Sequence, residues 1–270
     1  IVFGDWSSDV CSSDLIIRAI IGRLHAEGRE VYMSIVNESG ASIYSASPFA
    51  VAEFPDLDVT VRGAISIARR LQDPLSEFVK IDPKSLGVGQ YQHDVDQKEL
   101  KRRLDMVVMS AVNSVGVDIN TASIPLLSYV SGISEKIATE IVKFREQKGG
   151  VSARDELMSI KGLGAKTFER CAGFLRVRNG KNPLDNTAIH PERYPVVEKM
   201  CKDAKMNVGV VLEDTSLLAS IDTKKYADEV GQYTINDIIE ELKRPGRDVR
   251  SEFVPAPYSD EITDIKDVNV

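Results

Sequence analysis

Cysteine, histidine and aromatic residues are scarce in this sequence. Its 270 residues include three cysteines, three histidines and one tryptophan, and aromatic residues make up 6% of the chain. Cys11, Cys171 and Cys201 form no CxxC pair and no Cys/His spacing of the kind that binds zinc. A sparse, odd number of cysteines is typical of a reducing compartment. We therefore expect a cytoplasmic protein with no metal and no cofactor.

Long apolar runs and a net positive charge are also missing. No stretch approaches the length of a membrane span, and the first residues lack the basic and apolar regions of a signal peptide, so no membrane contact is expected. The net charge of −7 argues against a histone-like polyanion binder. Residues 130–180 are the exception, with ten Lys and Arg against six Asp and Glu. Any phosphate contact is expected there.

The beginning of the chain has an unusual pattern. GDWSSDVCSSDL (4–15) repeats WSSD and CSSD without the periodicity of a helix or a strand. It is similar to the translation of a sequencing-library adaptor, although a natural Ser/Asp-rich tail would have the same composition. We expect residues 1–15 to be a non-native tail without function, and the natural sequence to begin near Ile16.

The next segment has the pattern of an incomplete α/β unit. Residues 16–28 have helical apolar spacing and end at Gly28, and residues 29–38 form a predicted buried strand. A second helix is predicted over residues 59–74, stopped by Pro74. Because one strand cannot satisfy its own edges, its partners are expected upstream of this chain. The expected buried faces are Val31, Met33 and Ile35 on the strand, and Val61, Ile65, Ala68 and Leu71 on the helix.

Two further helices are predicted from apolar spacing and end signals. The first covers residues 96–116 and ends at Gly116, and the second covers residues 233–246 with Thr234 as its N-cap. Pro191 is suited to the first turn of another helix. The apolar stripe expected on the first helix consists of Leu100, Leu104, Val107, Ala111 and Val115.

An internal repeat occupies the basic region. Residues 122–147 and 153–177 both contain an apolar helix, a hydrophobic residue, one further residue, a glycine, a second hydrophobic residue and a small residue. A second helix with a lysine near its start then follows in each copy. The repeat therefore predicts two helix–turn–helix units in tandem.

The turns of this repeat have the chemistry of an anion site. Glycine permits a tight turn and close approach of a phosphate, and the first backbone N–H groups of the following helix are unpaired. In the second copy Leu163 is expected to point inward, while lysines supply positive charge. In the first copy Ser134 is expected to favour helix capping, with Lys136 and Lys143 as the cations. A single turn of this kind is often only a packing turn. The candidate nucleic-acid-binding residues are Ser131, Gly132, Ile133, Ser134, Lys136, Lys161, Gly162, Leu163, Gly164 and Lys166.

The repeat resembles the helix-hairpin-helix motif, and the surrounding chain resembles the bacterial transcription accessory proteins of the Tex family. The resemblance is carried by VNESGASIYSAS (36–47), EFPDLDVTVRGAISIARRLQDPL (53–75), KIDPKSLGVGQYQHDV (80–95) and NSVGVDINTAS (113–123). It implies a mainly α fold with a partial α/β, RNase H-like part, binding of RNA or DNA backbone, and contact with the transcription machinery.

The same resemblance implies a domain order. We expect the C-terminal half of a YqgF-type domain at 16–80, a connector and long helix at 81–116, tandem hairpins at 117–180, a second helical hairpin domain at 181–250, and a linker at 251–270. The linker would lead to an OB-fold barrel that this chain lacks.

A nuclease and a protein–protein scaffold are the alternatives. Related nucleases hold two metal ions with three or four carboxylates. Glu38 matches one of these positions, but Val61-Arg62 occupies the last-helix position, and Asp58 is better placed as a helix cap. His93 and Asp94 have no second histidine nearby, so a loop hydrogen bond is expected there. We expect a non-enzymatic protein with no catalytic residue.

Overall fold

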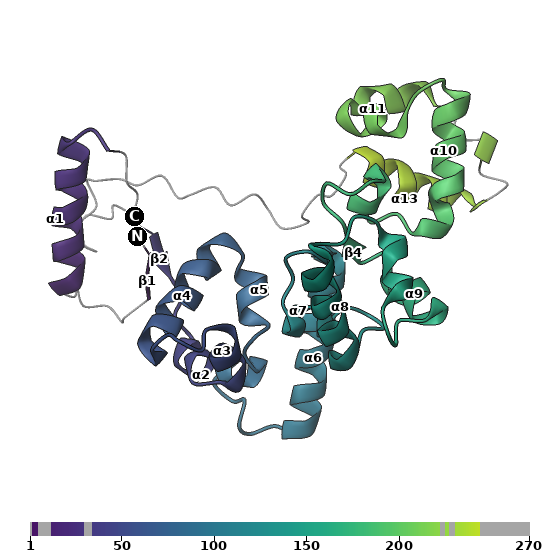
Figure 1. Cartoon of the computed structure of the whole chain (residues 1–270). Helices are drawn as coiled ribbons and strands as arrows, with labels where there is room; N and C mark the ends of the chain where they lie inside the picture. Colours follow the sequence, from purple (N-terminus) through teal and green to yellow (C-terminus); the bar gives the residue numbers. More distant parts are fainter. Residues whose placement is uncertain (1, 5–11, 30–33, 222–224, 227–229, 244–270) are drawn as a thin grey trace.

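A computed structural model describes residues 2–4, 12–29, 34–221, 225–226 and 230–243 of the chain. The described part is mainly helical, with two short parallel sheets, which confirms the predicted fold class (Figure 1). The strands are β1 (Val2–Gly4), β2 (Ser34–Val36), β3 (Val117–Asp118) and β4 (Leu175–Arg176). The α-helices are α1 (Ser12–Ala26), α2 (Ala41–Ser45), α3 (Pro48–Glu53), α4 (Val59–Gln72), α5 (Pro74–Phe78), α6 (Gln97–Val115), α7 (Ile124–Ser128), α8 (Glu135–Lys148), α9 (Ala165–Cys171), α10 (Tyr194–Asp203), α11 (Val208–Glu213) and α13 (Gln232–Lys243). The 3₁₀ helices are η1 (Pro83–Leu86), η2 (Arg154–Ser159), η3 (Pro183–Asn186), η4 (Pro191–Arg193) and η5 (Thr215–Ser220).

The predicted strand has a partner inside the chain. Strand β2 pairs in parallel with β1, with Val2 opposite Ser34 and Gly4 opposite Val36. The expectation that all its partners lie upstream of the chain is therefore wrong. Residues 12–15 also belong to helix α1, although they lie in the segment expected to be a non-native tail. The predicted inward positions 31 and 33 lie outside the described residues.

Several predicted helix ends are confirmed. The carboxylate of Asp58 accepts the N–H of Thr60 at 2.7 Å and caps α4. Gly28 and Gly116 follow α1 and α6 with φ of 75° and 77°, a left-handed conformation that glycine adopts at low cost. Pro191 begins η4. These residues mark the ends of the elements close to the positions that the sequence predicts.

The apolar stripe predicted for α4 is not the buried face. Val61 and Ala68 are exposed, and the fully buried residues of the helix are Ser66 and Arg70. The hydroxyl of Ser66 donates to Glu77 at 3.1 Å. Polar contacts therefore orient this helix, and the spacing of its apolar residues gives the wrong face.

A polar cluster fixes α2, α3 and α4 around Glu53. Its carboxylate accepts the Tyr44 hydroxyl at 2.6 Å, an Arg69 N–H at 2.7 Å and the Lys80 ammonium at 3.2 Å. Burial of this carboxyl raises its pKa, but the bond from Tyr44 and the charge of Lys80 outweigh that effect and lower the pKa below its usual value. A small apolar cluster of Tyr44, Ala50 and Ile81 packs beside it.

The stripe predicted for α6 is also partly wrong. The helix itself is confirmed over Gln97–Val115, and Asp96 caps it. Val107 is 66% exposed and Ala111 is exposed, whereas Val112 is fully buried. Val108 packs on the same core as Val112. The apolar residues of this helix support two overlapping stripes, and tertiary contacts select the one that includes Val112.

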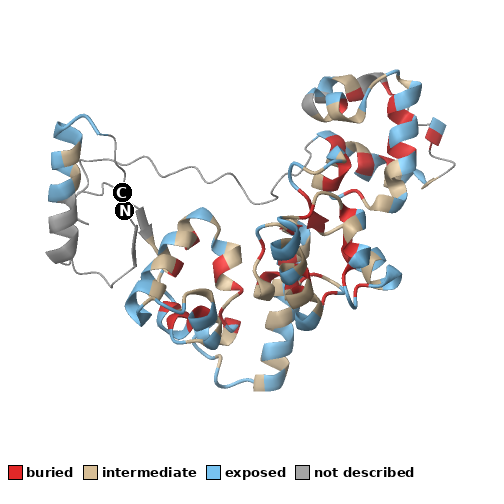
Figure 2. Cartoon of the chain, in the orientation of Figure 1, coloured by how far each residue is buried: buried red, intermediate tan, exposed pale blue. Residues whose placement is uncertain are grey.

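The hairpin region has one continuous core. It combines α7, α8, η2, α9 and the small sheet formed by β3 and β4, which pair in parallel with Val117 opposite Leu175. Figure 2 shows buried residues running through these elements. Cys171 lies in this core with no exposed surface, as expected. The fully buried residues of the core include Val112, Ile119, Leu127, Ala138, Ile141, Leu157, Cys171, Leu175 and Val177.

A separate core follows the hairpins. Helices α10, α11 and α13 and the 3₁₀ helix η5 enclose Val197, Met200, Val211 and Ile235. Helix α13 begins at Gln232, so Thr234 lies inside the helix and is not the predicted N-cap. Within the described residues, no helix combines the length and the apolar composition needed to cross a membrane.

Candidate nucleic-acid interface

The two predicted hairpins have turns of the same geometry. In the first, the N–H of Ile133 donates to the carbonyl of Val130 at 3.0 Å, and in the second the N–H of Leu163 donates to the carbonyl of Ile160 at 3.0 Å. Each donor lies 30 residues from its counterpart. The structure therefore confirms the tandem repeat seen in the sequence.

Glycine is required at one position of each turn. Gly132 has φ of 85° and Gly162 has φ of 89°, in the region that other residues enter only at a cost. The next residues, Ile133 and Leu163, are 5% and 1% exposed and lie in the hairpin core. Each turn is therefore anchored to the hairpin core by an apolar side chain, Ile133 or Leu163, while its glycine is exposed.

The two turns differ in how the following helix begins. The hydroxyl of Ser134 accepts the N–H of Ile137 at 3.4 Å and caps α8, as expected. Gly164 occupies the equivalent position before α9 and has no side chain to provide a cap. Nothing lies within 4 Å of the position that a Cβ atom on residue 164 would take. The second turn is consequently the more open of the two.

The turns pack on each other's helices. A Cβ atom on residue 132 would lie 3.1 Å from the Cβ atom of Arg170 and 3.6 Å from the carbonyl oxygen of Thr167, both in α9. A Cβ atom on residue 162 would lie 3.8 Å from Ile137 in α8. Thr167 and Ile137 are equivalent residues of the repeat. The two turns therefore lie side by side in a reciprocal arrangement.

Exposed positive side chains lie on the two hairpins, close to the turns along the chain. Lys136, Lys161, Lys166 and Arg170 are exposed, and none makes an ion pair with another described residue. Lys143, also expected to serve the first turn, instead pairs with Glu140 at 3.0 Å.

The structure brings the predicted site residues together on the two turns but exposes them unequally. Ser131 is half-buried, and the side chains of Ile133 and Leu163 face the core. The surface that a ligand could touch consists of Gly132, Ser134, Lys136, Lys161, Gly162, Gly164 and Lys166.

Sequence reasoning missed Arg170. It lies in the second hairpin, eight residues after Gly162, yet it reaches the first turn. No spacing within one hairpin reveals this contact, because it depends on how the two copies pack.

Arg154 is a second residue that the sequence did not reveal, and it joins the hairpins to the following core. Its side chain is fully buried and donates to the carbonyl oxygens of Leu175, Thr187 and Ile189. Burial lowers the pKa of this guanidinium. In the first hairpin the equivalent residue is Ile124. When the two copies of the repeat are aligned, an arginine stands in the second where the first has an apolar residue, and this difference is the sequence signal that could have revealed Arg154.

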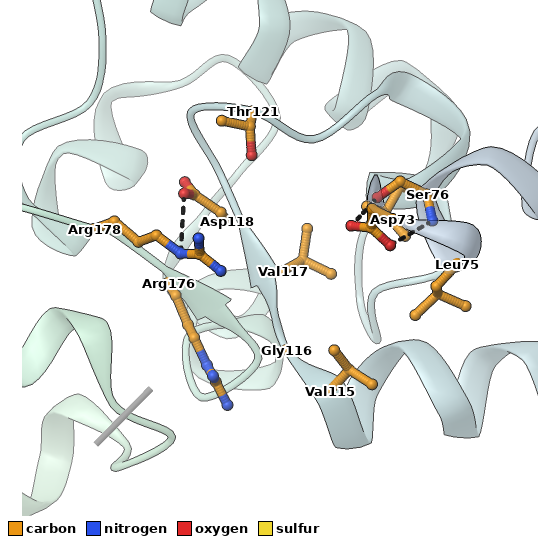
Figure 3. A pocket seen from close by; sticks show the side chains of 11 residues that line it. Asp73, Leu75, Ser76, Val115, Gly116, Val117, Asp118, Thr121, Arg176 and Arg178 are labelled. Atoms are coloured by element: carbon orange, nitrogen blue, oxygen red, sulfur yellow. Dashed lines mark hydrogen bonds and ion pairs between the residues drawn. The ribbon is translucent and has the colours of Figure 1, made fainter. Parts of the chain in front are cut away.

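A cavity of about 130 Å³ lies where α5, the end of α6, β3 and β4 meet. Figure 3 shows Arg178 pointing toward Asp118 on one side, with 3.5 Å between Arg178 Nε and Asp118 Oδ2. On the other side Asp73 accepts the hydroxyl of Ser76 at 2.7 Å. Arg178, Asp118 and Asp73 are thus engaged with neighbouring protein groups.

The carboxylate considered for nuclease chemistry has a basic neighbour. Arg70 donates to the carbonyl oxygens of Asn37 and Ser39, at 2.8 and 2.9 Å, on either side of Glu38. Burial lowers the pKa of Arg70, and the negative charges of Glu77 and Glu38 offset part of this effect. Among the described residues, no three His, Cys, Asp or Glu side chains come together as possible metal ligands. His93, for which a loop hydrogen bond is expected, has its ring Nε2 atom 3.4 Å from the side-chain Nε2 atom of Gln92.

Comparisons with known proteins agree with this architecture. The sequence matches the Tex protein YqgF-like domain over residues 8–72, the helix-hairpin-helix motif over 112–176 and a further HHH domain over 182–250. It is 52% identical over 237 residues to the transcriptional accessory protein Tex of Neisseria gonorrhoeae, covering 87% of this chain and 31% of that protein. It is also 52% identical over 235 residues to protein YhgF of Escherichia coli, covering 87% and 30%.

A human relative is more distant. The human S1 RNA-binding domain-containing protein 1 is 34% identical over an alignment 319 positions long, covering 96% of this chain and 31% of that protein. The chain therefore spans about a third of the length of the curated relatives it matches.

The paired turns and their shared core define the class of protein: this is a tandem helix-hairpin-helix protein. Its YqgF-like domain and its relatives give the family more closely. The chain is Tex-like over most of its length, as the sequence resemblance implied.

Proposed function

We propose that the paired turns bind the phosphate backbone of RNA or DNA without reading its sequence, as part of a Tex-like accessory role in transcription. The observation that carries the proposal is the side-by-side packing of two equivalent, glycine-containing turns, with four exposed cations on the same two hairpins. A phosphate contact of this kind positions a strand but carries no base information.

Charge and exposure support the same site. The turns lie in residues 130–180, where basic residues outnumber acidic ones. Lys161 and Lys166 flank the second turn, and Gly164 leaves the start of α9 open. Backbone N–H groups at such a position are good phosphate donors.

A non-enzymatic role is part of the proposal. Its support is the position of Arg70, whose guanidinium is bound to the backbone on both sides of Glu38. A fixed cation beside this carboxylate competes with a divalent metal ion for the same negative charge. The relatives named for transcription support the cellular role, and the transcription machinery is the partner that this role would require.

The experiment is a salt titration of RNA affinity. Lys161→Glu combined with Lys166→Glu should weaken binding of a mixed-sequence single-stranded RNA at least about tenfold and lower the slope of log K against log salt by about 1 to 2. Lys84→Glu combined with Lys98→Glu, on the connector and α6, makes the same charge change away from the turns. Equal affinity of the two double variants would refute the site. Cleavage of the RNA with Mg²⁺ present, abolished by Glu38→Gln, would refute the non-enzymatic role.

A further inference from the structure

The first turn has little attraction for a polyanion by itself. Helix α8 begins with Glu135 and Lys136, both exposed, and their charges cancel. Helix α9 begins with Ala165 and Lys166, and Lys161 precedes the same turn. A phosphate is therefore drawn to the second turn, whereas the first needs a further cation.

Arg170 is placed to supply that cation. A Cβ atom on residue 132 would lie 3.1 Å from the Cβ atom of Arg170 and 3.9 Å from its Cδ atom, so the aliphatic part of the arginine passes along the face of Gly132. The side chain is exposed, and within the described residues it makes no ion pair and no side-chain hydrogen bond. Its guanidinium is therefore available to a ligand at the first turn.

The reciprocal position in the first hairpin does not repeat this feature. Thirty residues before Arg170 stands Glu140, which pairs with Lys143 at 3.0 Å. The second turn therefore receives no arginine from α8. The repeat has diverged at this position so that the second hairpin contributes a cation to the first.

We propose that Arg170 completes the first turn as a phosphate-binding site, so that both turns form one composite surface for a nucleic-acid backbone. This inference rests on the proposed function. Lys136 and Arg170 serve the first turn, while Lys161 and Lys166 serve the second. A guanidinium can donate two parallel hydrogen bonds to one phosphate, which an ammonium cannot do. Arg170 therefore fixes the orientation of the strand as well as adding charge.

The test compares single charge removals in the whole chain, again with a mixed-sequence single-stranded RNA. Arg170→Ala should weaken binding about tenfold and reduce the salt slope by about 1. Arg170→Lys should keep the wild-type slope but recover only part of the affinity. Arg103→Ala removes an exposed arginine from α6, one that pairs with Glu99 at 2.8 Å, and should leave binding unchanged. Arg170→Lys keeps the aliphatic contact with Gly132 and should unfold at the wild-type temperature, whereas Arg170→Ala should unfold only slightly below it because the side chain is exposed.

A variant expected to bind RNA more tightly provides a second, independent test of the role of Arg170. Glu135→Gln removes the opposing charge at the first turn and should strengthen binding, and the gain should be smaller when Arg170 is alanine. If Arg170→Ala binds like Arg103→Ala while Lys166→Ala is weakened, this inference is wrong and the proposed function stands. If Lys166→Ala and Arg170→Ala both bind like Arg103→Ala, or if the unaltered chain does not bind, both are wrong.

Discussion

Arg154 donates a hydrogen bond from Nη1 to the hydroxyl of Tyr194 at 2.7 Å, and this bond links the second hairpin to the first residue of α10. The Tyr194 hydroxyl in turn donates to Asp185 at 2.8 Å, and Asp185 also accepts the backbone N–H of Arg154 at 3.0 Å. The positive charge is thus balanced by a buried carboxylate through a shared hydroxyl. The hairpins and the following core are joined by polar contacts that are all satisfied.

Removing the charge of Arg154 should be costly. Arg154→Met keeps a similar length but leaves three carbonyl oxygens without donors and removes the positive charge that balances buried Asp185, so the free energy of unfolding should fall by about 3–5 kcal/mol. Urea denaturation measures the loss. Tyr194→Phe removes a single hydroxyl from the same network and should cost only about 1–2 kcal/mol. A loss below that of Tyr194→Phe would show that Arg154 does not hold the two parts together.

Two glycines of one turn should respond differently to alanine. Gly162 has φ of 89°, so Gly162→Ala should cost about 1–2 kcal/mol of stability. Gly164 has φ of −80° and open space around it, so Gly164→Ala should cost less than about 1 kcal/mol. The added methyl group at residue 164 should still weaken RNA binding, because it stands where a phosphate would approach. Thermal unfolding and RNA titration of both variants separate the two effects, and unchanged RNA affinity of Gly164→Ala would contradict this assignment.

The thiol of Cys171 should be unreactive in the folded chain. It is fully buried, and burial raises its pKa to about 11, so only about a thousandth is thiolate at about pH 8. In a Cys11→Ser background, an alkylating reagent should modify Cys171 only as fast as the hairpin core opens. Mass spectrometry of labelled peptides at increasing urea measures this, with buried Cys201 as an internal comparison in the second core. Rapid labelling without urea would show that the hairpin core is open.

Glu156 should make stability depend on pH in the acid range. Hydrogen bonds from Lys148 at 2.7 Å and from the Ser152 hydroxyl at 2.6 Å lower the pKa of Glu156 from 4.5 to about 2. The folded pKa is depressed, so this stabilisation is present above about pH 4.5 and is lost as pH falls toward 2. The stability difference between wild type and Glu156→Gln should be constant near neutral pH and shrink below about pH 4.5. A difference that is the same at all pH values would exclude an ionic contribution.

The sequence predicts the turns well because their requirements are local. A glycine with positive φ, an apolar residue after it and a small residue at the helix start are all adjacent in the chain, so Gly162, Leu163 and Gly164 can be found from spacing alone. The same is true of Asp58 and Gly116 at helix ends.

The buried faces of the helices depend on partners that spacing does not identify. Val107 and Val112 both belong to plausible stripes of α6, and only the packing of the hairpin core selects Val112. In α4 the buried residues are polar, and apolar periodicity therefore points away from Ser66 and Arg70. Arg170 is missed for the related reason that its contact joins two copies of the repeat.

The reciprocal packing of the turns has a consequence for how the two copies can change. A Cβ atom on residue 132 would lie only 3.1 Å from the Cβ atom of Arg170. A larger residue at position 132 would therefore require α9 to shift away from the first turn. The second turn is less constrained, because a Cβ atom on residue 162 would lie 3.8 Å from Ile137. A change at Gly132 should therefore be accompanied by a change near Arg170, in the other hairpin rather than in its own.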